Sequence, residues 1–202
     1  MIVVGITGSS GSGKSLCSTI FEKDGYRVID CDKIAHNVVR NPLCREELCR
    51  FFGEDIFDKN NVYDRKKVAG IVFNNKNKLS KLNEITHKYI IKQIEEIIEE
   101  CKKDNINVLI DAPLLYEAKL EKICNKTIAV VADRTIKIGR LVARDNISEE
   151  MAERRLSNQL DDDYYIKNAD YVIYNNDNDD NNLYVKVKNI LIKLRGDINE
   201  ES

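Results

Sequence analysis

The sequence lacks several features that would assign it to a common class of protein. No apolar run approaches the roughly 18 residues of a membrane span, so we expect no membrane association. The formal net charge is -2, which argues against a strongly basic surface and makes nucleic acid an unexpected partner. Only two prolines, Pro42 and Pro113, are present, and no stretch has the composition of a flexible linker.

The cysteines lack the spacing of a metal site or a disulfide framework. None forms a Cys-x-x-Cys pair, and the six are scattered along the chain at Cys17, Cys31, Cys44, Cys49, Cys101 and Cys124. The first residues show no charged leader and no cleavage site, so no secretory or transit peptide is expected. In a protein that is not secreted, such cysteines are typical of reduced, mostly buried thiols. We therefore expect a cytoplasmic protein.

One short glycine-rich motif is present near the start. Residues 8–15 read Gly-Ser-Ser-Gly-Ser-Gly-Lys-Ser, the G-x-x-x-x-G-K-S pattern of a phosphate-binding loop (P-loop). An apolar run precedes it and a helical pattern follows, as the motif requires. Glycines let backbone N–H groups point at phosphate, Lys14 adds a charge for the β- and γ-phosphates, and Ser15 can ligate Mg²⁺. We expect ATP to be bound by Gly8, Gly11, Ser12, Gly13, Lys14, Ser15 and Leu16. The alternative is a glycine-rich turn that binds nothing.

Alternating strand and helix patterns indicate the fold class. Apolar runs suited to buried parallel strands lie at Ile2–Ile6, Tyr26–Ile29, Val108–Ile110, Ile128–Ala132 and Tyr171–Tyr174. They predict an α/β fold, a P-loop core with a five-stranded parallel sheet and helices on both faces. Two helical segments interrupt the alternation: residues 42–103, expected to form a separate lobe, and the arginine-rich residues 134–167. The core is then residues 1–41, 104–133 and 168–202.

Acidic residues follow three of the predicted strands, at the edge where ligands bind in such sheets. Asp32, two residues after Asp30, suits either a helix cap or a base that accepts a proton from an attacking hydroxyl. Asp30 is the competing candidate for the base. Asp111 ends an apolar run, the pattern of a carboxylate that holds Mg²⁺ beside a P-loop. Asp133, after the fourth strand, is expected at the same crevice.

Basic residues in the two helical segments have two interpretations. Arg140 and Arg144 are four residues apart and share one helix face. They form either a solvated surface or a lid that clamps the transferring phosphoryl group. Arg65 and His87, in the insertion, either contact a substrate or are ordinary surface and packing residues.

Taken together, several blocks resemble the dephospho-CoA kinase family. They are Gly5–Gly8 leading into the P-loop, Asp30–Ala35, Asp64–Arg65, Val72–Phe73, Ile85–His87, Asp111–Glu117, Arg140–Asp145, Arg155–Gln159 and Ala169–Ile173. The resemblance implies transfer of the ATP γ-phosphoryl group to the ribose 3′-hydroxyl of dephospho-CoA, with Mg²⁺ as cofactor. It implies that residues 42–103 bind the substrate and that residues 134–167 form the lid.

The resemblance also assigns roles to single residues. It implies that Asp32 is the base, that Lys14 and Arg140 are catalytic, and that Arg144 contacts ATP. It places Asp32, Arg65, His87 and Leu114 at the substrate, and Ser15 and Asp111 at the metal. The sequence departs from the family pattern at Lys88, where proline is usual, and at Asp161, Tyr165 and Ile166, where proline and a basic pair are usual.

Two other functions fit parts of the sequence. A P-loop kinase acting on a nucleoside or nucleotide would carry the same loop. A GTPase would need an Asn-Lys-x-Asp motif, and Asn125-Lys126-Thr127-Ile128 lacks the aspartate. The oligomeric state is left open, and a monomer is sufficient for the predicted site.

Overall fold

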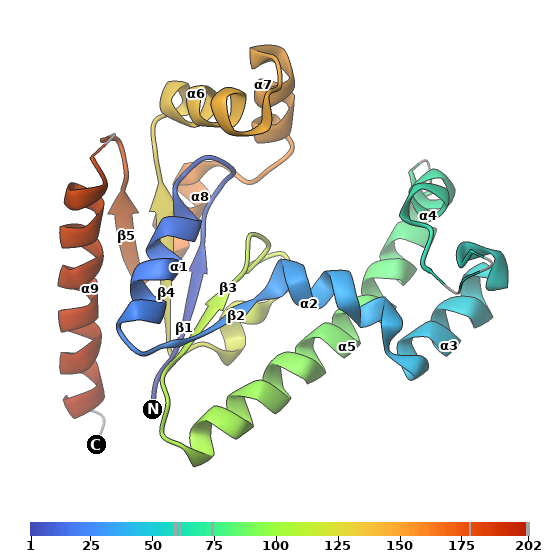
Figure 1. The fold of residues 1–202 in the computed structure, drawn as a ribbon, viewed down its shortest axis with the longest axis horizontal. Coiled ribbons are helices and arrows are strands. Elements are labelled where there is room, and N and C mark those ends of the chain that lie inside the picture. The colour runs from blue at the N-terminus through green and yellow to red at the C-terminus, as the bar shows by residue number, and fades with distance from the viewer. Residues whose placement is uncertain (59, 61, 74, 178, 201–202) are drawn as a thin grey trace. The chain divides into compact units, whose positions relative to one another are not determined.

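The computed structural model describes residues 1–58, 60, 62–73, 75–177 and 179–200 (Figure 1). The chain forms two compact units. The first comprises Met1–Asp30 and Ile98–Ser202, and the second comprises Cys31–Ile97. The first unit contains the sheet and the second is mainly helical.

The first unit is built on a five-stranded parallel sheet. Its strands are β1 (Val3–Thr7), β2 (Arg27–Asp30), β3 (Val108–Asp111), β4 (Lys126–Val131) and β5 (Tyr171–Tyr174), in the order β2-β3-β1-β4-β5. The predicted fold class is confirmed. β4 begins two residues earlier than predicted, because Lys126 and Thr127 pair with Val4 and Gly5 of β1. The N–H and hydroxyl of the buried Thr127 also donate to Asp170 Oδ2, at 2.7 and 2.8 Å.

Helices cover both faces of this sheet. On one face, α1 (Lys14–Lys23) and α9 (Asp180–Glu200) bury Phe21 and Leu191 against the strands. On the other face, Tyr165 of α8 (Asp162–Asn168) packs on Ala129 and Val131. A hairpin of α6 (Arg134–Asp145) and α7 (Glu149–Ser157), drawn in gold in Figure 1, has its own small apolar core.

The second unit has a separate apolar core. Its elements are α2 (Cys31–Asn37), α3 (Pro42–Phe52), α4 (Arg65–Val72), most of α5 (Lys76–Lys103) and short 3₁₀ turns. Asn41 Oδ1 accepts from Leu43 N at 3.0 Å and Cys44 N at 3.3 Å, so it caps α3 as Pro42 begins the helix. Buried side chains from these elements, including Leu48, Ile56, Val68, Ile85 and Tyr89, fill the core. None of the described helices in either unit has the length and apolarity needed to span a bilayer.

Candidate functional site

The glycine-rich loop joins β1 to α1, at the carboxyl end of the central strand. Gly11 and Gly13 have φ values of +80° and +98°, which favour glycine. A Cβ on Gly11 would also lie 2.7 Å from the carbonyl oxygen of Lys137, and one on Gly13 would overlap Asn175 Nδ2. The helix that follows directs the positive end of its dipole at the loop. The loop therefore has the backbone geometry of an anion cradle.

One polar atom inside the loop suggests a ligand. Ser12 is 1% exposed, and its Oγ is buried without a hydrogen-bond partner among the described residues. A buried hydroxyl left unpaired costs about 1–3 kcal/mol, so such groups usually have a partner. A phosphate oxygen in the cradle would accept its hydrogen bond.

Two side chains of α1 hold the carboxylate of Asp111. Lys14 Nζ forms an ion pair with Asp111 Oδ1, and Ser18 Oγ donates to Asp111 Oδ2 at 2.7 Å. The side chains of Lys14 and Asp111 are each 14% exposed. The loop lysine and the strand-end aspartate are thus neighbours, with the carboxylate fixed at both oxygens.

The residues at this edge fit a magnesium ion. Asp111 ends β3, and Ser15, in the first turn of α1, is exposed. Mg²⁺ is usually bound through one or two carboxylates together with substrate phosphates and water. The described residues contain no group of three or more His, Cys, Asp or Glu side chains that would form a cage for a metal. The arrangement therefore suits a metal that arrives with a phosphate ligand.

Side chains from distant parts of the chain contact the loop at four successive residues. Ser9 Oγ donates to Asp162 Oδ1 (3.1 Å), Ser10 N to Gln159 Oε1 (2.9 Å), Arg140 Nη1 to the Gly11 carbonyl (3.2 Å), and Asn175 Nδ2 to the Ser12 carbonyl (2.8 Å). All four partners lie 129 to 163 residues away in sequence. The loop is therefore shaped by the rest of its unit as well as by its own glycines.

The two predicted lid arginines have different surroundings. Arg140 also donates to the Asp177 carbonyl at 2.9 Å, so its guanidinium links the P-loop to the segment after β5. Arg144 instead makes a bidentate pair with Asp145, at 2.7 and 2.9 Å. Hydrogen bonds from Arg144 and Arg155 hold the pKa of Asp145 well below its usual range. In this structure Arg140 contacts the loop, whereas the contacts of Arg144 lie within the α6–α7 hairpin.

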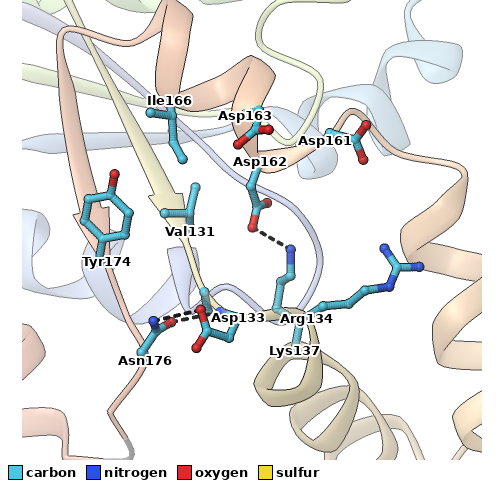
Figure 2. A pocket seen from close by; sticks show the side chains of 11 residues that line it. Val131, Asp133, Arg134, Lys137, Asp161, Asp162, Asp163, Ile166, Tyr174 and Asn176 are labelled. Carbon is cyan, nitrogen blue, oxygen red and sulfur yellow. Dashed lines mark hydrogen bonds and ion pairs between the residues drawn. The ribbon is translucent and has the colours of Figure 1, made fainter.

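A pocket of about 370 Å³ opens between β4, β5, α6 and α8 (Figure 2). Lys137 and Asp162, both in its lining, form an ion pair at 2.7 Å, and Asp133 is hydrogen-bonded to Asn176 by side chain and backbone. Asp133, expected at the crevice, therefore contacts the segment after β5. Ile166 lines the pocket, the side chain of Tyr165 in α8 is buried against β4, and Asp161 precedes that helix.

The predicted substrate residues lie in both units. Leu114, in the first unit, is 53% exposed. Arg65 and His87 lie in the second, where Arg65 Nη2 donates to the His36 carbonyl at 3.1 Å and burial lowers the pKa of His87. Asp32 lies in the first turn of α2, two residues after Asp30, which is in register with Asp111 across β2 and β3. Lys88 pairs with Glu47 at 2.6 Å.

Sequence reasoning did not identify some of the residues around the loop. Ser18 lies four residues after Lys14, so it shares the same helix face. This spacing could have predicted its contact with Asp111. Asn175 directly follows β5, where ligand-facing residues are common. Gln159 ends the Arg155–Gln159 block, but its contact with Ser10 was not predicted. Lys137 and Asp162 carry no such signal, because their contacts depend on how α6 and α8 pack.

Known proteins resemble this chain in sequence. A family model described as dephospho-CoA kinase matches residues 2–181. A dephospho-CoA kinase of Fusobacterium nucleatum is 40% identical over 178 residues, covering 88% of this chain and 91% of that protein. One from Aquifex aeolicus is 38% identical over 196 residues, covering 96% and 98%.

Solved structures resemble it in fold. A Thermus thermophilus protein has a TM-score of 0.81 at 28% identity, covering 96% of this chain and 97% of that one. A dephospho-CoA kinase from Campylobacter jejuni has a TM-score of 0.62 at 27% identity, covering 95% and 96%. A shikimate kinase from Acinetobacter baumannii, with a TM-score of 0.56 at 13% identity and coverage of 96% and 94%, shares the fold alone.

Proposed function

The chain belongs to the dephospho-CoA kinase family, and from this membership we propose how its residues carry out the family's reaction. The protein is an ATP-dependent kinase with an alcohol acceptor. It transfers the γ-phosphoryl group of ATP to the ribose 3′-hydroxyl of dephospho-CoA and releases coenzyme A and ADP. The observation that carries the proposal is the loop with its paired Lys14 and Asp111, together with the buried Ser12 hydroxyl, which has no hydrogen-bond partner in the described part of the chain.

The loop residues bind the triphosphate. Gly8, Gly11, Ser12, Gly13 and Leu16 contribute backbone N–H groups and one hydroxyl, while Lys14 exchanges its contact with Asp111 for the β- and γ-phosphates. The residues that would hold Mg²⁺ are Ser15 and Asp111, and the ion when bound neutralises phosphate charge. Arg140, already at the loop, stabilises the charge on the transferring group, and Arg144 contacts ATP only after leaving Asp145.

Asp32 acts on the acceptor. Its carboxylate accepts the proton of the 3′-hydroxyl as that oxygen forms a bond to the γ-phosphorus, and the bond from this phosphorus to the β–γ bridging oxygen breaks. Arg65, His87 and Leu114 bind dephospho-CoA. Burial lowers the pKa of His87, which favours its neutral imidazole.

The test is ADP release from ATP and Mg²⁺ with a panel of acceptors. We expect turnover with dephospho-CoA and none above background with adenosine, AMP or shikimate. Lys14→Ala should lower kcat/KM on the order of 10²–10³-fold, because the loop cation stabilises phosphate charge. Turnover with a nucleoside or nucleotide instead would assign the chain another acceptor, and full activity of Lys14→Ala would refute the role of the loop.

A further inference from the structure

A buried lysine outside the P-loop contacts the first serine of the loop. The side chain of Lys137, in the first turn of α6, is only 7% exposed. Its Nζ donates to Asp162 Oδ2 at 2.7 Å and to Ser9 Oγ at 3.1 Å. Ser9 Oγ in turn donates to Asp162 Oδ1 at 3.1 Å. These side chains come from the loop, α6 and α8, and we call their closed set of hydrogen bonds the Ser9 triangle. Figure 2 shows Lys137 directed at Asp162.

Stability alone does not account for this ion pair. Removing an ammonium group from water is costly even when it is paired, and apolar side chains of similar size often stabilise a fold as well or better. An apolar pair, however, would form no hydrogen bond to Ser9. The property that distinguishes the charged pair is therefore its hold on the loop.

Two residues of segment 134–167 also contact the loop at Ser10 and Gly11, the two residues that follow Ser9. The Lys137 carbonyl oxygen lies against Gly11, so closely that a Cβ there would be 2.7 Å away. Gln159, three residues before Asp162, accepts a hydrogen bond from Ser10 N. The outer side of the loop is thus held at Ser9, Ser10 and Gly11.

We propose that Lys137 and Asp162 are positioning residues for nucleotide binding: through Ser9 they fix the outer side of the P-loop, so that its inner N–H groups stay spaced for a polyphosphate. This inference rests on the function proposed above, because it takes a nucleotide polyphosphate as the ligand. The two side chains act through Ser9 and do not touch the ligand themselves.

The decisive variant replaces the ion pair with apolar side chains. Lys137→Met alone should lower Tm, because it leaves the partly buried Asp162 carboxylate, 24% exposed, without its counterion. The double variant Lys137→Met/Asp162→Leu should recover most of that loss. Its affinity for MgADP, measured by titration calorimetry, should nevertheless stay about tenfold weaker than that of the unmodified chain, which corresponds to about 1.4 kcal/mol. The KM for ATP should rise and the KM for dephospho-CoA should not.

Asp24→Asn is the matched control. Asp24 pairs with Lys188 at 2.6 Å and Arg195 at 2.7 Å, and its side chain is 7% exposed. It caps the end of α1 away from the loop, about 15 Å along a ten-residue helix. This variant should lose stability and keep its MgADP affinity. If the double variant binds MgADP as tightly as the unmodified chain, the ion pair is merely structural and the inference is overturned.

Ser9→Ala supplies a second test that leaves the ion pair in place. On its own it should weaken MgADP binding without lowering Tm appreciably. Added to the double variant, it should have no further effect, because the hydroxyl has already lost both partners. If Ser9→Ala weakens MgADP binding equally in the unmodified chain and in the double variant, Ser9 contacts the nucleotide directly. That result would refute the claim that Ser9 acts through the Ser9 triangle.

The outcomes separate this inference from the proposed function. An unmodified chain that does not bind MgADP would refute the proposed function. An unmodified chain that binds MgADP, with a stable double variant that binds it equally well, would refute only the positioning role.

Discussion

Replacing one P-loop glycine tests whether the loop is shaped by close packing or only by its backbone angles. Gly11 and Gly25 both have φ in the left-handed region, at +80° and +93°. A Cβ on Gly11 would lie 2.7 Å from the Lys137 carbonyl oxygen and 3.1 Å from its Cα. A Cβ on Gly25 would meet no atom of the described residues within 4 Å. Gly25→Ala is therefore a control with the same backbone strain and no clash.

The expected losses of stability have two causes, the left-handed backbone conformation and the clash of the new methyl group with Lys137. A left-handed conformation costs an alanine about 1–2 kcal/mol relative to glycine, and this applies to both variants. Forcing an extra methyl against packed backbone adds about 1–3 kcal/mol, and this applies only to Gly11→Ala. In a chain of this size about 1 kcal/mol lowers Tm by about 2–4 °C, so Gly25→Ala should lose about 2–8 °C and Gly11→Ala about 4–20 °C.

The assay pairs thermal unfolding with MgADP binding. Gly25→Ala should bind MgADP as the unmodified chain does, because Gly25 lies in the turn between α1 and β2. Gly11→Ala should bind at least tenfold more weakly, because the loop must move away from α6 to admit the methyl group. Equal Tm losses and equal MgADP affinities in the two variants would refute the argument that close approach of α6 shapes the loop.

Four further outcomes are expected. Asp32→Asn should lower kcat about 10²–10⁴-fold with little change in the KM for ATP, because an amide cannot accept the proton; steady-state kinetics showing only a raised ATP KM would exclude the base role. Arg140→Ala should lower kcat about 10²–10³-fold, whereas Arg154→Ala, paired with Glu150 on an exposed surface, should leave kcat unchanged in the same assay. Burial lowers the pKa of His87 in the folded chain, so the unfolded chain binds the proton more readily. In urea titrations, the free energy of unfolding should therefore be retained above pH 6.5 and fall as the pH drops below it. His87→Asn should remove that pH dependence. Burial, and then the Asp111 carboxylate, raise the pKa of the Cys17 thiol to about 12, so mass spectrometry after iodoacetamide treatment at pH 8 should find Cys17 unmodified until the protein is unfolded; rapid labelling of the folded protein would contradict this.

The sequence was most informative where local rules act. The P-loop pattern is a short motif with its own backbone requirements, and the five strands are apolar runs whose type depends on composition. The boundary of β4 was less predictable. Lys126 and Thr127 are polar, and their inclusion depends on pairing with Val4 and Gly5 of β1, which their own composition does not indicate. Asp170, 43 positions away, accepts two hydrogen bonds from Thr127.

The partners of the loop were predictable only in part. Arg140 was selected for its charge, and Arg144 for sharing its helix face, but only Arg140 contacts the loop because Asp145 pairs with Arg144. The roles of the predicted site residues remain predictions. Lys137 was not predicted, because no single-sequence pattern shows that the packing of α6 and α8 buries it beside Ser9.

The central position of β1 has a consequence for hydrogen exchange. All five of its residues are buried, and it is paired with β3 on one side and β4 on the other. Its amides can exchange with deuterium only when the sheet opens as a whole, whereas the glycine-rich segment begins at the very next residue. Nucleotide that binds only the folded chain raises the free energy of that opening, so it should slow exchange throughout β1 by one common factor, whereas amides after Thr7 that exchange by local opening should gain protection by a different amount.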